Sequence, residues 1–68
     1  MTEVVFLVEE APEGGYVARA LGPSIITEAD DLPALRDAIR EAVRCHFDGP
    51  DTPSAIRLHF VRDEVIAA

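Results

Sequence analysis

Residues 31 to 47, DLPALRDAIREAVRCHF, carry the clearest pattern in the chain and predict an amphipathic helix. Six side chains recur at spacings of three and four residues, which places them along one stripe of the helix surface. They are Leu32, Leu35, Ile39, Ala42, Val43 and His46. Asp31 suits the N-cap because its carboxylate can accept a hydrogen bond from an amide of the first turn, and Pro33 is tolerated there. We therefore expect one face of this helix to be buried.

Extended segments before and after the helix predict a sheet. Residues 3–10, EVVFLVEE, are apolar on both faces in their middle, which is typical of an interior strand or of one covered on both sides. Glycines and a proline between residues 11 and 15 indicate a hairpin turn. The expected strands are residues 3–10, 16–21, 24–28 and 55–61. The sequence thus predicts an α+β fold of order β-β-β-α-β, with an antiparallel-rich sheet and one helix packed on one face.

The chain has 68 residues and is expected to form a single domain over residues 1–68. A domain of this size buries about 60% of the surface that its unfolded chain exposes, so its core is thin. The single cysteine, Cys45, cannot form an internal disulfide, and stability must come from packing and association. No apolar run approaches the roughly 20 residues of a membrane span, and no signal peptide is recognisable, so a cytoplasmic location is expected.

Residues 63–68, DEVIAA, follow the last expected strand and leave three alternatives open. They could fray, form one helical turn capped by Asp63, or extend the strand. Val65 and Ile66 favour a packed position for this segment, whichever conformation it takes.

The formal net charge of −7 limits the class of partner. Binding to nucleic acid depends on clustered lysine and arginine, and the chain contains no lysine. A basic protein partner suits such a chain better. Arg36, Arg40 and Arg44 repeat every four residues, but Asp37 and Glu41 each precede an arginine by three positions, which favours local ion pairs on a solvated helix face. RNA contact through these arginines is the weaker alternative.

No constellation of residues predicts catalysis, a cofactor or a metal. Cys45 and His46 are adjacent, so on a helix they point about 100° apart, and His59 lies on a distant strand. A zinc site is therefore not expected, and Cys45 is expected to be a buried or half-buried inert thiol. Neighbouring carboxylates in a strand point to opposite faces, and Gly14 and Gly15 join strands instead of preceding a helix. The chain is accordingly expected not to be an enzyme.

Strand alternation predicts an apolar surface on the side of the sheet opposite the helix. Ile56, Leu58 and Phe60 are expected beneath the helix, which sends the residues between them outward. Arg19 is unsuited to burial, so it is expected to point away from the helix. Val17 and Leu21, which alternate with the same period in that strand, are expected on the same outward face. The first strand contributes either its odd-numbered or its even-numbered apolar residues. The expected oligomer or partner interface is Val5, Leu7, Val17, Arg19, Leu21, His59 and Val61.

A homodimer or larger homo-oligomer built on the sheet is expected from this surface. A chain this small seldom leaves such an apolar patch exposed to water. Strand edges with unpaired backbone groups offer a second route to self-association.

Residues 14–43, GGYVARALGPSIITEADDLPALRDAIREAV, resemble the N-terminal domain of HicB-type antitoxins. The resemblance covers residues 3 to about 61 and includes a tyrosine-led strand, a leucine-glycine step and a capped helix. The residues that match the family pattern are Tyr16, Ala18, Leu21, Gly22, Asp31, Leu32, Glu41 and Ala42. The chain departs from the pattern at Ala29, where the family often has glycine, and at Asp31, where it often has threonine. Aspartate caps a helix as well as threonine does.

The resemblance implies a reduced ribonuclease-H-like sheet without the catalytic carboxylates. It further implies a non-enzymatic protein that neutralises a small basic HicA-like ribonuclease toxin by covering it. The expected form is a short one, without the C-terminal DNA-binding module of many members, so operator binding is not expected. The alternative is a self-associating structural or small-ligand-binding orphan domain of the same fold, since fold does not fix function.

Overall fold

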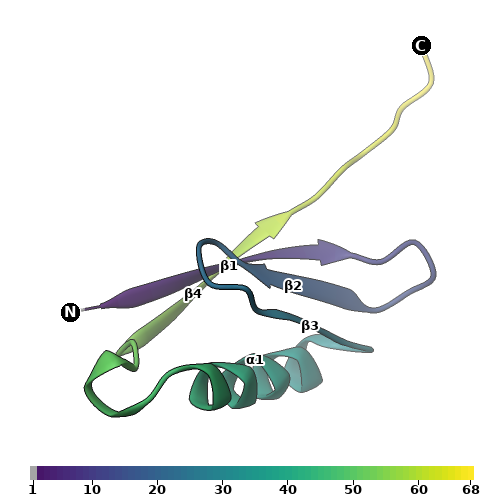
Figure 1. Cartoon of the computed structure of the whole chain (residues 1–68). Coiled ribbons are helices and arrows are strands. Elements are labelled where there is room, and N and C mark those ends of the chain that lie inside the picture. The colour runs from purple at the N-terminus through teal and green to yellow at the C-terminus, as the bar shows by residue number, and fades with distance from the viewer. Residues whose placement is uncertain (1) are drawn as a thin grey trace.

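The computed structural model describes residues 2–68 and confirms the α+β fold with the expected order of elements (Figure 1). Met1, the first residue of the expected domain, lies outside the described residues. A short 3-10 turn, η1 (Gly49–Asp51), joins the helix to the last strand. The other elements are β1 (Glu3–Glu10), β2 (Tyr16–Ala20), β3 (Ile26–Ala29), α1 (Leu32–His46) and β4 (Ala55–Val61).

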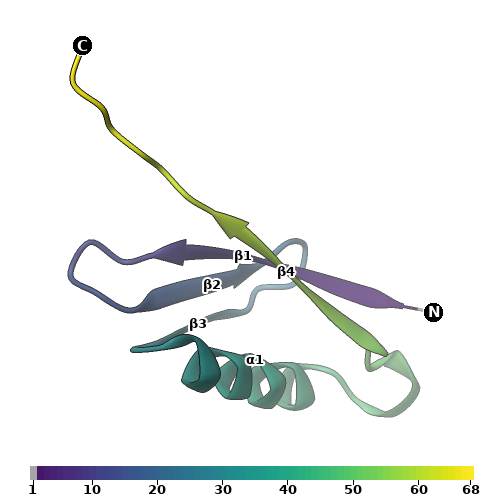
Figure 2. The same cartoon turned by 180° about the vertical axis from the view of Figure 1, so that it is seen from behind.

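The four strands form one mixed sheet of order β3-β2-β1-β4. Antiparallel ladders join β1 to β2 and β2 to β3, whereas β1 and β4 are parallel. The parallel pair arises because α1 carries the chain back along the sheet before β4 begins, as parallel neighbours require. The expectation that residues 3–10 form an interior strand is confirmed. Within residues 2–68, α1 covers one face of the sheet and leaves the other open (Figures 1 and 2).

Helix α1 begins and ends close to where its capping residues predict. The Asp31 carboxylate accepts a hydrogen bond of 2.8 Å from the Ala34 amide, so the expected N-cap is confirmed. The Phe47 amide donates to the Val43 carbonyl and closes the last turn. Within residues 2–68, no helix is long and apolar enough to cross a membrane.

Nine apolar residues form a single core between α1 and the sheet. They are Val4, Phe6, Val8, Ala18, Ala20, Ile25, Leu35, Ile39 and Val43. Among the described residues no polar or charged side chain is buried. The core is therefore held by apolar burial and close packing.

The predicted stripe of α1 is wrong at His46, which is exposed. Leu35, Ile39 and Val43 are buried as expected. Phe47, immediately after the helix, packs against the core, and the His46 ring lies edge-on to it with centroids 4.9 Å apart. The more apolar of the two rings thus takes the inner position, which leaves the imidazole in solvent.

The strands β2 and β3 differ from their predicted bounds. Strand β2 ends at Ala20 instead of Leu21, and β3 begins at Ile26 instead of Ser24. The Ala20 amide donates to the Ile25 carbonyl, and the Ile25 amide donates to the Pro23 carbonyl, so this segment forms a tight turn. Ile25 is buried in the core from this turn and not from a strand.

The prediction that Phe60 lies beneath the helix is wrong, because its side chain is 51% exposed. Helix α1 packs near β2 and β3 and leaves β4 beyond its edge. Ile56 and Leu58, nearer the start of β4, are half-buried.

Val65 and Ile66, which we expected to pack somewhere, do not pack against residues 2–68, since they are 95% and 78% exposed. Residues 62–68 form neither a helical turn nor a continuation of β4. They run outward from the end of β4, away from the body of the domain (Figures 1 and 2).

We expect Ile39→Ala to lower the free energy of unfolding by about 2 to 5 kcal/mol, because Ile39 is fully packed and a thin core cannot close the cavity. Denaturant unfolding of the two proteins measures this loss. Ile26→Ala is the matched control: its side chain is 70% exposed, so its loss should stay within about 0.5 kcal/mol. Equal losses for the two variants would contradict the burial of the α1 stripe.

We expect Gly15→Ala to destabilise the domain more than Gly14→Ala. Both glycines have positive φ, +81° and +101°, so alanine at either position costs about 1 to 2 kcal/mol. A Cβ at Gly15 would also lie 2.8 Å from the Ala29 carbonyl oxygen, whereas one at Gly14 would meet nothing within 4 Å. Thermal unfolding of both variants tests the difference, and a Gly14 variant as unstable as the Gly15 variant would contradict the close approach.

Candidate functional site

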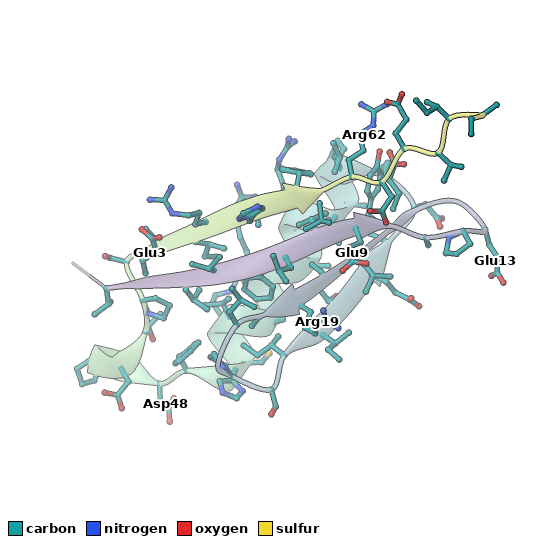
Figure 3. The ribbon with its side chains drawn as sticks, turned by 90° about the horizontal axis from the view of Figure 1, so that it is seen from above. Glu3, Glu9, Glu13, Arg19, Asp48 and Arg62 are labelled. Carbon is teal, nitrogen blue, oxygen red and sulfur yellow. The ribbon has the colours of Figure 1, made fainter. Side chains whose placement is uncertain are left out.

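The strand ladders place six of the seven predicted interface residues on the sheet face opposite α1, which we call the open face (Figure 3). Leu21 follows β2 directly, and its amide donates a hydrogen bond to the Val5 carbonyl on β1. The ladders bring the other six together in rows. Leu7 lies between Arg19 on β2 and His59 on β4, and Glu9 lies between Val17 and Val61. Of the two alternatives for β1, the odd-numbered residues face outward, because Val4, Phe6 and Val8 are buried under the helix. The role of the open face in binding stays a prediction.

The middle of the open face is apolar and reached by solvent. Val5, Leu7 and Val17 are half-buried by their neighbours within the sheet, and Leu21 is 51% exposed. Ile26 belongs to the same face, since it pairs with Arg19, and it is 70% exposed. Ile26 is absent from the predicted interface because the third expected strand was not assigned to either face. Its ladder pairing with Arg19 places it on the open face.

Ion pairs between neighbouring strands flank this apolar middle. Arg57 of β4 makes a bidentate pair with Glu3 of β1, with Nη2 and Oε2 3.2 Å apart. The hydrogen bond from Arg57 lowers the pKa of the Glu3 carboxyl, and the same bond raises the pKa of Arg57. At the other end of the face, Arg19 Nη2 lies 3.8 Å from Glu9 Oε1, and Figure 3 labels both residues. The open face therefore has an apolar centre and a charged rim whose arginines already have carboxylate partners.

Carboxylates that make no ion pair within residues 2–68 lie together at the hairpin end of the molecule. Glu13 lies in the β1–β2 turn at the tip of the hairpin (Figure 3), and Glu28 and Asp30 lie at the end of β3. With Tyr16 they line a shallow hollow of about 540 Å³. Within residues 2–68, no group of three His, Cys, Asp or Glu side chains is arranged to hold a metal ion. The hollow combines carboxylates with an aromatic ring, the groups that accept a lysine or arginine side chain.

Two curated proteins match this chain closely. The UPF0150 protein of Archaeoglobus fulgidus is 50% identical over 50 residues, which cover 74% of this chain and 74% of that protein. The UPF0150 protein of Thermotoga maritima is 38% identical over 65 residues, which cover 96% and 91%. This chain belongs to the UPF0150 family. No family model matches the chain, and no solved structure matches it.

The cysteine and helix arginines of this UPF0150 protein lie on the solvent side of α1. The prediction of a buried or half-buried thiol is wrong, since Cys45 is exposed, with its Sγ 3.8 Å from Glu41 Oε1. Position 45 lies outside the buried stripe that ends at Val43. Both predicted ion pairs are confirmed, Asp37 with Arg40 and Glu41 with Arg44.

We expect Arg57→Gln to raise the pKa of Glu3, because the hydrogen bond and positive charge that favour its ionised form are removed. An NMR titration of the Glu3 carboxyl in both proteins measures the change. Arg40→Gln, which breaks the ion pair with Asp37 on α1, is the control and should leave the pKa of Glu3 unchanged. An unchanged Glu3 midpoint in the Arg57 variant would contradict the pair.

The sign of the accompanying pH effect follows from the lowered pKa. The folded state holds the Glu3 proton less tightly than the unfolded chain does, so the pair adds stability above the unfolded pKa. That contribution disappears as the pH falls through the folded pKa, below the usual value of 4.5. The stability difference between the wild type and Arg57→Gln should therefore shrink in acid.

Proposed function

We propose that this UPF0150 protein is a non-enzymatic protein-binding module of the HicB antitoxin type. In this proposal it neutralises a small basic HicA-like ribonuclease by covering it, and it supplies no catalytic group of its own. The observation that carries the proposal is an uncovered apolar sheet face on a strongly acidic chain. The β-β-β-α-β order and the residues shared with the HicB pattern add support.

The charge distribution favours a basic partner. Within residues 2–68, four of the six arginines form ion pairs with four of the thirteen carboxylates. The remaining carboxylates include those of the hairpin end, and they set the negative field around the molecule. A field of one sign raises the rate of encounter with an oppositely charged protein and repels acidic competitors.

The open face has the layout of a protein interface. Leu7, Val17, Leu21 and Ile26 form an apolar centre, and the pairs Glu3–Arg57 and Glu9–Arg19 lie at its rim. Apolar side chains at the centre of an interface carry most of the binding energy, while the polar rim fixes orientation. We assign the open face as the surface that contacts the basic partner.

A self-associating orphan domain is the second candidate function. The exposure of Leu21 and Ile26 favours it, because the same face could pack against a second copy of the chain and form the homodimer expected from the sequence. The two candidates differ in one measurable property. Under the second candidate, the isolated Leu21→Glu variant has a lower mass in solution than the isolated wild type, because its dimer dissociates. Under the first candidate, the two proteins have the same mass in solution.

We expect a small basic protein encoded beside this chain to bind it, and Leu21→Glu to weaken that binding by about tenfold or more. Calorimetry of the purified pair measures the affinity. Ala34→Glu adds the same charge on exposed α1 and should bind like the wild type. Affinity should fall as salt rises, because salt screens the attraction between an acidic and a basic protein.

Two results would contradict the proposed function. One is an affinity that does not change with ionic strength, which would mean that charge attraction does not contribute to binding. The other is a neighbouring basic protein that fails to bind while Leu21→Glu dissociates the isolated chain, which would favour the orphan domain.

A further inference from the structure

A second uncovered surface lies between α1 and β4, on the helix side of the sheet. It is a groove of about 480 Å³ with apolar walls and two arginines. The side chains that define it are Arg36, Ile39, Arg40, Pro53, Ile56 and Leu58. The groove exists because α1 packs near β2 and β3 and stops short of the β4 edge.

The outer edge of β4 borders this groove and has no strand beside it within residues 2–68. Strand β4 pairs with β1 on its inner side along all seven of its residues, Ala55–Val61. Its outer backbone amides and carbonyls are therefore placed to accept another strand. An added strand here would gain ladder hydrogen bonds from the edge and side-chain contacts from the groove.

Residues 62–68 have the extended shape of such a strand (Figures 1 and 2). The segment RDEVIAA is extended and leaves the domain at the end of β4 (Figures 1 and 2). It carries two carboxylates, Asp63 and Glu64, followed by the exposed Val65 and Ile66.

We propose that the α1–β4 groove of one copy binds residues 62–68 of a second copy, reciprocally, in a strand-exchanged homodimer. The two-fold axis lies near the ends of the two β4 strands, which run antiparallel. Each extended segment then lies along the β4 edge of the partner and joins the two sheets into one. Contacts of this kind are isologous, because each copy gives a strand and receives one.

Exchange between copies is favoured over folding back within one chain. The segment continues in the direction of β4, whereas its own groove lies beside residues it has already passed. Reaching that groove would need a tight reversal near residue 62, and RDEVIAA contains no glycine, proline or asparagine, with Asp63 as its one turn-forming residue. A second copy in antiparallel orientation presents its groove without any turn.

Charge makes the groove and the segment complementary. Arg36 makes no ion pair with residues 2–68, and Arg40 has an exposed pair with Asp37 at 3.2 Å. The two arginines give the groove a positive charge, although the net charge of the chain is −7. Alternate residues of the added strand face the groove, so Glu64 supplies a carboxylate to these arginines and Ile66 supplies an apolar side chain to Ile56 and Leu58, while Asp63 and Val65 lie on the opposite face of that strand. The dimer leaves the open face exposed, so this inference does not rest on the proposed function.

Sedimentation velocity of the full chain at micromolar concentration tests the dimer. The wild type should sediment as a dimer, and Ile66→Lys should raise its dissociation constant by about tenfold or more, because a charge replaces an apolar side chain at the exchanged strand. Ile26→Lys is the matched control, an exposed isoleucine on the open face, and should leave the dimer intact. Neither position is buried, so both variants should fold.

A mixing experiment tests the charge pairing. The groove variant Arg36→Glu/Arg40→Glu and the tail variant Asp63→Arg/Glu64→Arg should each be monomeric alone, since each places like charges together. Mixed in equal amounts, they should form a heterodimer in which both contacts are restored. Both variants keep a negative net charge, so net charge cannot explain their association.

Hydrogen exchange locates the contact. Amides of β4 and residues 62–68 should gain protection as concentration rises, and amides of the β1–β2 hairpin should not. A wild-type monomer, an Ile26→Lys variant that dissociates the dimer, or a mixture that stays monomeric would each overturn the proposal.

Discussion

Burial of one stripe of α1 against one face of β1 determines where every other element of the domain lies. Leu35, Ile39 and Val43 share a core with Val4, Phe6 and Val8, and these residues contribute two thirds of the buried set. The helix therefore runs across the sheet, and the chain that leaves it returns to the vacant edge of β1. Small residues on β2, Ala18 and Ala20, let α1 approach the sheet closely on that side. The displacement of α1 from β4 follows from this packing.

One helix cannot cover a four-stranded sheet, and the two uncovered surfaces differ in chemistry. On the open face both arginines, Arg19 and Arg57, have carboxylate partners on β1. The α1–β4 groove keeps Arg36 outside any ion pair formed by residues 2–68. A surface of the first kind suits a partner that contributes apolar area, and a surface of the second kind selects an acidic one. A single small domain thereby has room for two different occupants.

The predictable parts of this UPF0150 domain are those set by local pattern. Periodicity and capping located α1 at Asp31, and alternation assigned all seven open-face residues to one side. The errors at Ser24–Glu28, Cys45 and His46 arise locally, from a tight turn before β3 and from the end of the buried stripe at Val43. The error at Phe60 has a different cause. Periodicity tells which side of a strand faces the helix, but the position of the helix across the sheet depends on packing between distant residues. The α1–β4 groove was missed for the same reason, because it exists only where the helix fails to cover β4.

The parallel pairing of β1 with β4 also governs the order in which the domain can assemble. Val4 and Ile56 are ladder partners, yet more than fifty positions separate them in the sequence. The β1–β2 hairpin closes through local contacts, whereas the β4 contact must wait for the whole intervening chain. During synthesis β1 leaves the ribosome first and is the last strand to have both of its edges paired. Until β4 arrives, a β-branched edge and its apolar side chains stay open to other nascent chains.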